Sequence, residues 1–331
     1  MSVKVEQKEV TSDEDAIRLD RWFQRHYPQL NNIRLQKLLR TGQVRVDGKR
    51  ADGKTRLSAG QVIRIPPLPV AAETPKVEKQ KDKPRASAAI ARQLKDCVLY
   101  DDDDVVVINK PPGLAVQGGT GITESLDDWL HLLQAKESKG KERPRLVHRL
   151  DRETSGVLVI ARTAFAAAKL AAAFRERTTQ KYYLAVLQSC PRPRKGTVDA
   201  PLLRLPDKKV GGKVVVDKKG EPAVSHYRTL VKAKNGMTLT LLKPETGRTH
   251  QLRVHMQHLG TPIVGDPLYN PDAKKEGLHL HAARLVIPHP RHNREKRSAF
   301  LDIAAPLPEL QVTTYEKLGF DTHRDWTEEE K

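Results

Sequence analysis

The most constraining feature of the sequence is the stretch His148–Arg162, in which a charged loop leads directly into an apolar run. Val157–Ile160 consists of aliphatic residues typical of a buried strand, and Thr-Ser-Gly at 154–156 predicts a tight turn into that strand. Asp151 lies in the preceding loop with an arginine nearby on each side. Because nearby guanidinium groups favour the charged form of a carboxyl group, Asp151 should stay ionised. On these residues alone, a structural Asp–Arg loop and a reactive carboxylate both fit.

The net charge of the chain points to a polyanionic partner. Its 331 residues include 59 Lys and Arg against 41 Asp and Glu, which gives a formal net charge of +18. Such a basic chain favours nucleic acid as its partner, with an anionic membrane surface as the competing interpretation. No apolar stretch approaches the roughly 20 residues of a membrane span, and the N-terminus lacks the apolar core of a signal peptide. We therefore expect a cytoplasmic protein that does not contact a membrane.

The first part of the chain predicts a small basic domain. Residues 1–15 are polar and mixed in charge, which predicts a flexible arm. Residues 16–65 predict a small α/β domain with two short amphipathic helices and paired strands around an Asp-Gly turn at 47–48. This domain contains twelve Lys and Arg against three Asp, which is half the net charge of the chain.

The positions of these basic residues favour RNA binding. Arg34, Lys37 and Arg40 recur every three residues, largely on the side of their helix away from the leucines, and Arg45 follows in the strand. A solvated charged surface is the alternative for such a pattern. We predict that these four residues contact RNA phosphates.

A linker and a larger domain follow. Residues 66–93 are rich in Pro, Ala and Lys and contain five prolines, which predicts an extended linker. Residues 94–331 alternate strand and helix patterns and predict the second domain. Within it, Thr163 can cap an Ala-rich helix, and a strand is expected at 181–186.

The sequence contains no convincing site for a metal or cofactor. Its two cysteines are too few for a zinc site or a disulfide framework. His250, His255 and His258 suggest a metal, but no cysteine cluster or His-Glu-x-x-His pattern accompanies them. Gly-Gly-Thr-Gly at 118–121 lacks the Gly-Lys-Ser/Thr ending of a phosphate-binding loop. We expect neither a metal nor a nucleotide cofactor.

The motifs of the second domain identify a family. His-Arg-Leu-Asp-Arg-Glu-Thr-Ser-Gly at 148–156 resembles the catalytic motif of the RluA-type pseudouridine synthases, which isomerise uridine in structured RNA. The segments 109–113 and 245–260 resemble further motifs of that family, in the same order. The resemblance spans about residues 94–310 and implies an α+β pseudouridine synthase fold with a central, mostly antiparallel mixed sheet. Residues 35–48 resemble the RNA-binding domain first described in ribosomal protein S-four.

The resemblance also implies roles for individual residues. Asp151 matches the nucleophile, for which attack at C1′, attack at C6 and removal of a proton all stay open. Arg248 matches the arginine that pairs with this carboxylate. Tyr183 matches the tyrosine that stacks on the target base and can serve as a base, with a core aromatic as its alternative. Leu252 matches an apolar contact to the uracil. Arg149 matches the residue that fills the gap left by the extruded base, with a surface ion pair as its alternative.

Two features resemble the large-subunit ribosomal RNA enzymes of the RluC kind: Arg-Ile-Pro-Pro-Leu-Pro at 64–69 and Gly-Gly-Thr-Gly at 118–121. We therefore expect site-specific formation of pseudouridine in 23S ribosomal RNA by a monomer that flips the target base. Enzymes of the RluD kind share the two-domain layout. A non-catalytic ribosome-assembly factor that binds RNA and a transfer-RNA pseudouridine synthase are the competing interpretations.

Overall fold

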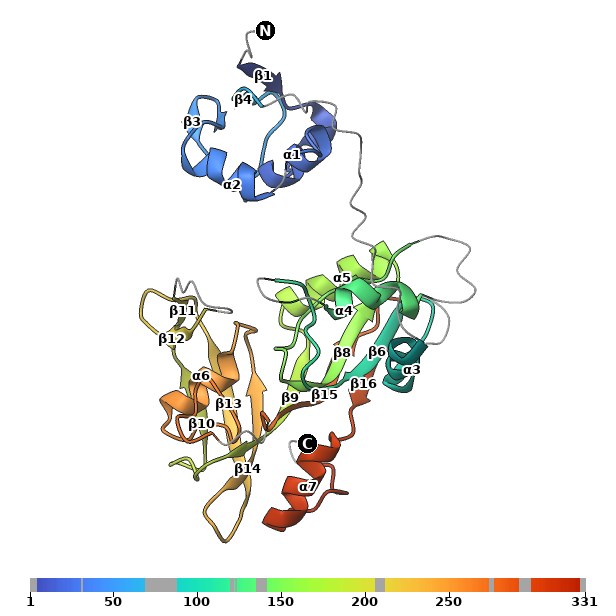
Figure 1. The fold of residues 1–331 in the computed structure, drawn as a ribbon, viewed down its shortest axis with the longest axis vertical. Helices are drawn as coiled ribbons and strands as arrows, with labels where there is room; N and C mark the ends of the chain where they lie inside the picture. Colours follow the sequence, from blue (N-terminus) through green and yellow to red (C-terminus); the bar gives the residue numbers. More distant parts are fainter. Residues whose placement is uncertain are drawn as a thin grey trace. The chain divides into compact units, whose positions relative to one another are not determined.

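The chain divides into two compact units, Met1–Lys81 and Asp82–Lys331, drawn in Figure 1. The computed structural model describes residues 5–30, 32–68, 88–119, 122, 124–134, 142–205, 212–273, 277–291 and 299–327. Most of the predicted linker lies outside these residues.

The first unit is a four-stranded sheet in the order β1-β4-β2-β3, packed against two α-helices within its described residues. Its elements are β1 (Glu6–Glu9), the 3-10 helix η1 (Ser12–Glu14), α1 (Leu19–His26), α2 (Asn32–Arg40), β2 (Arg45–Val46), β3 (Lys49–Arg50) and β4 (Val62–Ile65). Trp22 and Phe23 of α1 and Leu35 of α2 pack with Ile63 and Ile65 of β4. The helices and strands expected in residues 16–65 are therefore present.

The prediction of a flexible arm is wrong for the described part of residues 1–15. Glu6–Glu9 pairs antiparallel with β4, and Val10 lies in the core with 1% of its surface exposed. Glu14 is also buried, and its carboxylate accepts a hydrogen bond of 2.8 Å from Trp22 Nε1. No strand pattern marks this segment because the side chains of β1 are polar on both faces. Backbone pairing with the edge of β4 stabilises it instead.

The second unit is built on a ten-stranded sheet. Its main path runs β10-β13-β14-β9-β15-β8-β6-β5, while β16 pairs with β15 and β7 pairs with β8. The strands are β5 (Val98–Asp101), β6 (Val105–Lys110), β7 (Arg145–Leu146), β8 (Ser155–Ala161), β9 (Gln180–Leu187), β10 (Lys195–Asp199), β13 (Val224–Lys232), β14 (Thr238–Pro244), β15 (Leu280–Pro288) and β16 (Phe300–Ala304). A separate hairpin pairs β11 (Leu202–Arg204) with β12 (Val214–Val216).

The pairing confirms the predicted α+β fold with a mostly antiparallel mixed sheet. Strands β8 and β15 are parallel. The other pairs in the described sheet are antiparallel. The helices are α3 (Ala88–Asp96), α4 (Leu126–Trp129) with the 3-10 helix η2 (Leu130–Leu133), α5 (Ala164–Arg175), α6 (Gln251–His258) and α7 (Glu309–Leu318).

Helix α3 corrects the boundary of the predicted linker. It begins at Ala88, inside the range 66–93, and its Leu94 packs into the core of the second unit. The Ala-rich composition of this segment favours a helix, because alanine has the highest helix propensity of all residues.

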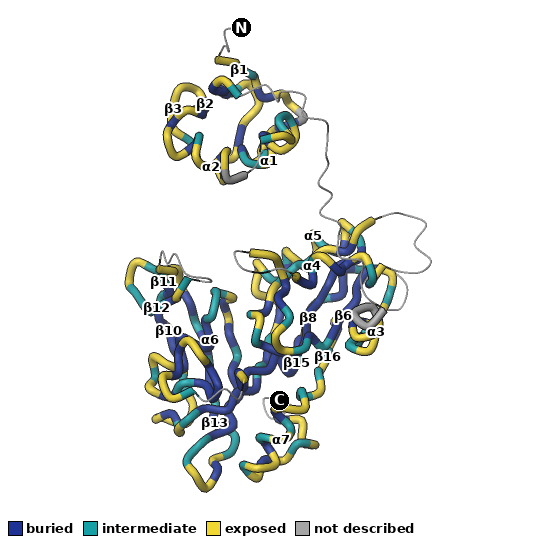
Figure 2. Tube along the Cα trace, in the orientation of Figure 1, coloured by how far each residue is buried: buried dark blue, intermediate teal, exposed yellow. Residues whose placement is uncertain are grey.

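Helices cover both faces of the central strands β6 and β8 (Figure 1). Successive residues of a strand point to opposite faces. Leu158 and Ile160 of β8 pack with α4 and η2, whereas Val157 and Val159 pack with α5. Thr163 caps α5 as predicted, because its Oγ1 accepts a hydrogen bond of 3.1 Å from the Ala166 amide. The strands are thus buried along most of their length (Figure 2), which gives a rigid support for the loop that precedes β8.

Candidate active site

The position of Asp151 depends on the junction between β8 and β15. These strands run parallel here, with Ser155 opposite His281 and Gly156 opposite Ala282. Gly156 has φ 111°, and a Cβ atom at this position would overlap the Ala282 backbone. The glycine of the motif is therefore required by the close approach of the two strands, and the loop with Asp151 is fixed at this end.

A buried lysine holds the other side of the loop. Lys110, at the end of β6, has none of its surface exposed, and its Nζ donates to the carbonyl oxygens of Pro111 (2.8 Å), Leu114 (3.0 Å) and Arg152 (3.0 Å). Burial lowers the pKa of Lys110 to about 7, although the negative charges of Glu153 and Asp151 oppose this shift. Lys110 thus ties the segment that follows β6 to the residue directly after Asp151.

His148 anchors the start of the loop. Its Nε2 accepts a hydrogen bond of 2.8 Å from the Val159 amide of β8, and its ring stacks on Phe174 of α5 with centroids 4.5 Å apart. An acceptor at Nε2 requires an unprotonated nitrogen there. Burial holds the pKa of His148 well below its ordinary value, in agreement with a neutral ring.

An arginine and a second carboxylate complete the surroundings of Asp151. Nη1 of Arg253, on α6, lies 3.4 Å from Oδ2 of Asp151. The Nε and Nη2 atoms of the same guanidinium each donate to Asp266 at 2.8 Å, and Asp266 is fully buried. Such a two-pronged pair fixes the plane of the guanidinium. Arg253 can therefore hold the Asp151 carboxylate in one direction.

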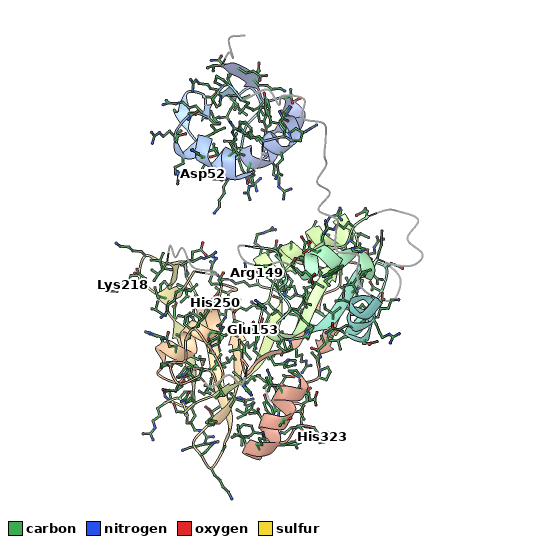
Figure 3. The ribbon with its side chains drawn as sticks, viewed as in Figure 1. Asp52, Arg149, Glu153, Lys218, His250 and His323 are labelled. Carbon is green, nitrogen blue, oxygen red and sulfur yellow. The ribbon has the colours of Figure 1, made fainter. Side chains whose placement is uncertain are left out.

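A cavity of about 500 Å³ opens over Asp151. Its lining includes Arg149, Asp151, Tyr183, Arg248, His250, Leu252 and Arg253. In Figure 3, two of these residues, Arg149 and His250, lie between the part of the second unit that contains β8 and the part that contains α6. The cavity thus joins side chains from segments about a hundred residues apart in the chain.

Tyr183 on β9 lines this cavity. It also packs against two clusters of buried residues, one that contains Leu158 and one that contains Leu242. Burial, and then the charge of Asp151, raise the pKa of Tyr183. A phenol with a raised pKa keeps its proton at neutral pH. Stacking on the base and acting as a base both stay predictions for Tyr183.

Two residues shape the turn before α6. His250 adopts left-handed backbone angles (φ 55°) and its Nδ1 lies 2.8 Å from the Tyr269 hydroxyl. Gln251 is buried, and its Oε1 accepts hydrogen bonds from Thr246 Oγ1 (2.7 Å) and from the Arg248 amide (3.0 Å). These contacts orient the loop that forms one side of the cavity.

Comparison with known proteins identifies the family to which this site belongs. Residues 104–258 match the family described as RNA pseudouridylate synthase. The ribosomal large subunit pseudouridine synthase C of Vibrio cholerae is 36% identical over 305 residues, which cover 89% of this chain and 91% of that protein. The chain belongs to the RluA family of pseudouridine synthases.

This pseudouridine synthase is therefore an isomerase. It is also similar to other relatives, one of them over nearly the whole chain. The ribosomal large subunit pseudouridine synthase C of Escherichia coli is 35% identical over 319 residues, which cover 93% of this chain and 95% of that protein. The solved structure of human RNA pseudouridylate synthase domain containing 4 gives a TM-score of 0.58 at 31% identity, covering 70% of this chain and 97% of that one.

The predicted pairing of Arg248 with Asp151 is wrong. Nη1 of Arg248 lies 2.7 Å from Glu221 Oε2, and its Nε donates to the Pro222 carbonyl at 3.1 Å. Arg253 occupies the place beside Asp151 because it belongs to the buried first turns of α6, with 3% of its surface exposed. Arg248 precedes the left-handed residue at which the chain turns into this helix, so its guanidinium points to the cavity rim. Both arginines belong to the same motif, and only their burial distinguishes them.

The remaining predicted residues lie as follows. Arg149 is exposed and lines the same cavity as Asp151. Leu252, in the first turn of α6, is 6% exposed and lines the cavity as well. In the first unit, Arg34, Lys37 and Arg40 are exposed on α2, opposite the buried Leu35 and Leu39. Arg45 is exposed, and its guanidinium donates to the carbonyls of Gly42 and Gly48.

Two of the three histidines that suggested a metal, His250 and His255, have protein partners. His255 is buried, with Nδ1 2.9 Å from Ser225 Oγ and Nε2 3.0 Å from the Ala200 carbonyl oxygen. Among the residues that the structure describes, no group of three or more His, Cys, Asp and Glu side chains is placed to hold a metal ion. No described helix is long and apolar enough to cross a membrane.

Proposed function

We propose that this pseudouridine synthase converts specific uridines of 23S ribosomal RNA to pseudouridine, with Asp151 as the nucleophile. The observation that carries the proposal is the ion pair of Asp151 and Arg253 inside a cavity. Relatives named for the large ribosomal subunit, matched over most of their length, support the choice of RNA. The cytoplasmic location and the monomeric state expected from the sequence stay predictions.

The chemistry assigns each group a task. The N1–C1′ bond of uridine breaks, the uracil turns within the cavity, and C5 joins C1′. The hydrogen on C5 leaves as a proton and N1 takes up a proton from solvent, so the product is an isomer of uridine. Asp151 attacks the uridine as a carboxylate, as carboxylates do in glycoside chemistry, and the bond that it forms breaks again before the product leaves. Arg253 pairs with that carboxylate and directs it. Tyr183 stacks on the base and Leu252 makes an apolar contact with it, so that uracil stays bound while it turns.

The loss of the C5 hydrogen provides a direct test. RNA labelled with tritium at C5 of uridine should release tritium to water when it is incubated with the purified chain. We expect release from a large-subunit rRNA transcript and none from transfer-RNA transcripts. Release from transfer RNA alone would support the proposed reaction and contradict the proposed substrate.

Base flipping is expected because Asp151 lies in a cavity with only 16% of its side chain exposed. A uridine within a helix cannot reach Asp151, so it must leave its stack at a cost of a few kcal/mol. Arg149 is exposed at the cavity, two residues before Asp151, and its planar guanidinium can stack on the bases that the uridine leaves.

Arg149→Ala should therefore reduce base extrusion, which a fluorescent base beside the target uridine reports as a smaller rise in emission on binding. Arg152→Ala is the matched control, because Arg152 lies on the same loop but does not line the cavity. Equal signals from Arg149→Ala and wild type would assign Arg149 to the surface ion pairs instead.

The first unit is proposed to bind RNA phosphates through α2. Replacing Arg34, Lys37 and Arg40 together by Ala should weaken RNA binding and make the salt slope of log K shallower by about 2, since each single-strand phosphate contact contributes about 0.7. Filter binding between low and high salt measures this slope. Replacing the exposed Lys232, Lys234 and Lys317 of the second unit provides a control of equal charge. If both triple variants gave the same slope, α2 would have no specific part in binding.

A further inference from the structure

A second cavity lies next to the active site. It has a volume of about 610 Å³ and is formed by β10, β13, β14 and the segment that leads into β9. Arg177, Lys181, Pro244 and Glu245 line both this cavity and the one over Asp151. The two cavities are therefore neighbours with a common wall at one end of the sheet.

The lining of the second cavity is strongly basic. It contains Arg177, Lys181, Lys195 and Lys243, whereas its single carboxylate is that of Glu245. Glu245 itself contacts two other lining residues, with Oε1 2.7 Å from His226 Nε2 and Oε2 3.9 Å from Arg177 Nη1. The cavity thus favours an anion, and two of its lining cations, Arg177 and Lys195, are exposed.

The cations sit on a fixed framework. Thr197, His226 and Lys243 lie directly opposite one another on the adjacent strands β10, β13 and β14. Thr197 Oγ1 lies 2.8 Å from His226 Nδ1. Lys181 donates from Nζ to the carbonyls of Glu245 (3.4 Å) and Thr246 (3.2 Å), in the loop that borders the active site. Three of the four cations, Lys181, Lys195 and Lys243, therefore lie on strands of the sheet, and Arg177 lies in the turn before β9.

The cavity also offers neutral polar groups. The Thr179 side chain lines it, and its hydroxyl is buried with no hydrogen-bond partner among the described residues, with 8% of the residue exposed. Only Tyr227, Leu241 and Pro244 contribute large apolar surfaces. A cavity lined by four cations, two of them exposed, suits a negatively charged chain better than it suits a buried apolar cofactor.

We propose that this second cavity, the flanking cleft, binds backbone phosphates of the RNA strand next to the target uridine. The inference rests on the proposed function, because the wall common to both cavities would place these phosphates directly beside the flipped nucleotide. The strand passes from the active site over Arg177 and Lys181 to Lys195 and Lys243. Recognition then extends beyond the immediate surroundings of the target base.

Replacing Lys195 and Lys243 together by Ala tests the flanking cleft. Two RNAs are compared: a transcript with the target and its flanking strands, and a short stem-loop with the target alone. For the long RNA, we expect the Kd and KM to rise about tenfold and the salt slope to become shallower by about 1.4, as for two lost contacts. For the short RNA we expect no change, and kcat at saturating RNA should stay near that of wild type.

Lys232→Ala with Lys234→Ala is the matched control, because these exposed lysines lie at the other end of the same hairpin and outside the cleft. An unchanged Kd and salt slope for the long RNA would overturn the inference. An equal loss for both RNAs would also overturn it, since the cleft would then contact the target stem-loop. Absence of tritium release by wild type would count against the proposed function alone, because the binding comparison requires no turnover.

Discussion

Asp151→Asn lowers the rate of pseudouridine formation by at least about 10³-fold in our account, while the affinity for RNA changes little. Removing the nucleophile from a set of cooperating catalytic residues typically lowers the rate by this factor or more. Asparagine matches the shape of the carboxylate, so the loop between Lys110 and β8 should keep its structure. Tritium release under single-turnover conditions measures the rate, and filter binding measures the affinity.

The neighbouring carboxylate provides the control for this result. Glu153→Gln removes one negative charge from the same loop, and Glu153 does not line the cavity over Asp151. Its rate should stay close to that of wild type. A rate for Asp151→Asn within about tenfold of wild type would mean that another group supplies the nucleophile.

Arg253→Lys should lower both the stability of the protein and the rate of pseudouridine formation. Lysine keeps the charge but cannot bond Asp266 through two parallel donors and face Asp151 at the same time. Asp266 is fully buried, and breaking such a buried pair costs about 3–5 kcal/mol. We therefore expect a lower free energy of unfolding together with a rate that falls by about 10²-fold, because the Asp151 carboxylate loses its fixed direction.

Arg248→Lys tests whether Arg253 or Arg248 is the arginine that directs Asp151. Its side chain is partly exposed and contacts Glu221, so the free energy of unfolding should change by less than about 1 kcal/mol. Urea unfolding and tritium release on both variants make the comparison. A larger loss of rate in Arg248→Lys than in Arg253→Lys would favour the pair expected from the sequence.

The sequence predicted best those features that depend on local patterns. The cap at Thr163 and the helical spacing of the leucines in α2 each follow from a few neighbouring residues, and the structure contains them. The strand β1 could not be predicted in this way. Its polar side chains carry no period, and it exists because β4 offers an open edge more than fifty residues later.

In the active site, too, features that depend on a local sequence pattern could be predicted, and features that depend on distant contacts could not. Asp151 could be found because nine consecutive residues form a recognisable motif. Arg253 was missed because the choice between two arginines of one motif depends on which of them the first turns of α6 bury. The support given by Lys110 to the carbonyl of Arg152 joins segments 42 residues apart, and no local pattern marks that contact.

Mapping of pseudouridine in total RNA tests the central claim most directly. RNA from cells that lack this gene is labelled with carbodiimide, and each pseudouridine is detected as a stop of reverse transcription. Our account predicts that a few stops in large-subunit ribosomal RNA disappear, and that wild type restores them whereas Asp151→Asn does not. A complete set of stops in these cells, with no second synthase acting at the same sites, would contradict it and favour a non-catalytic assembly factor.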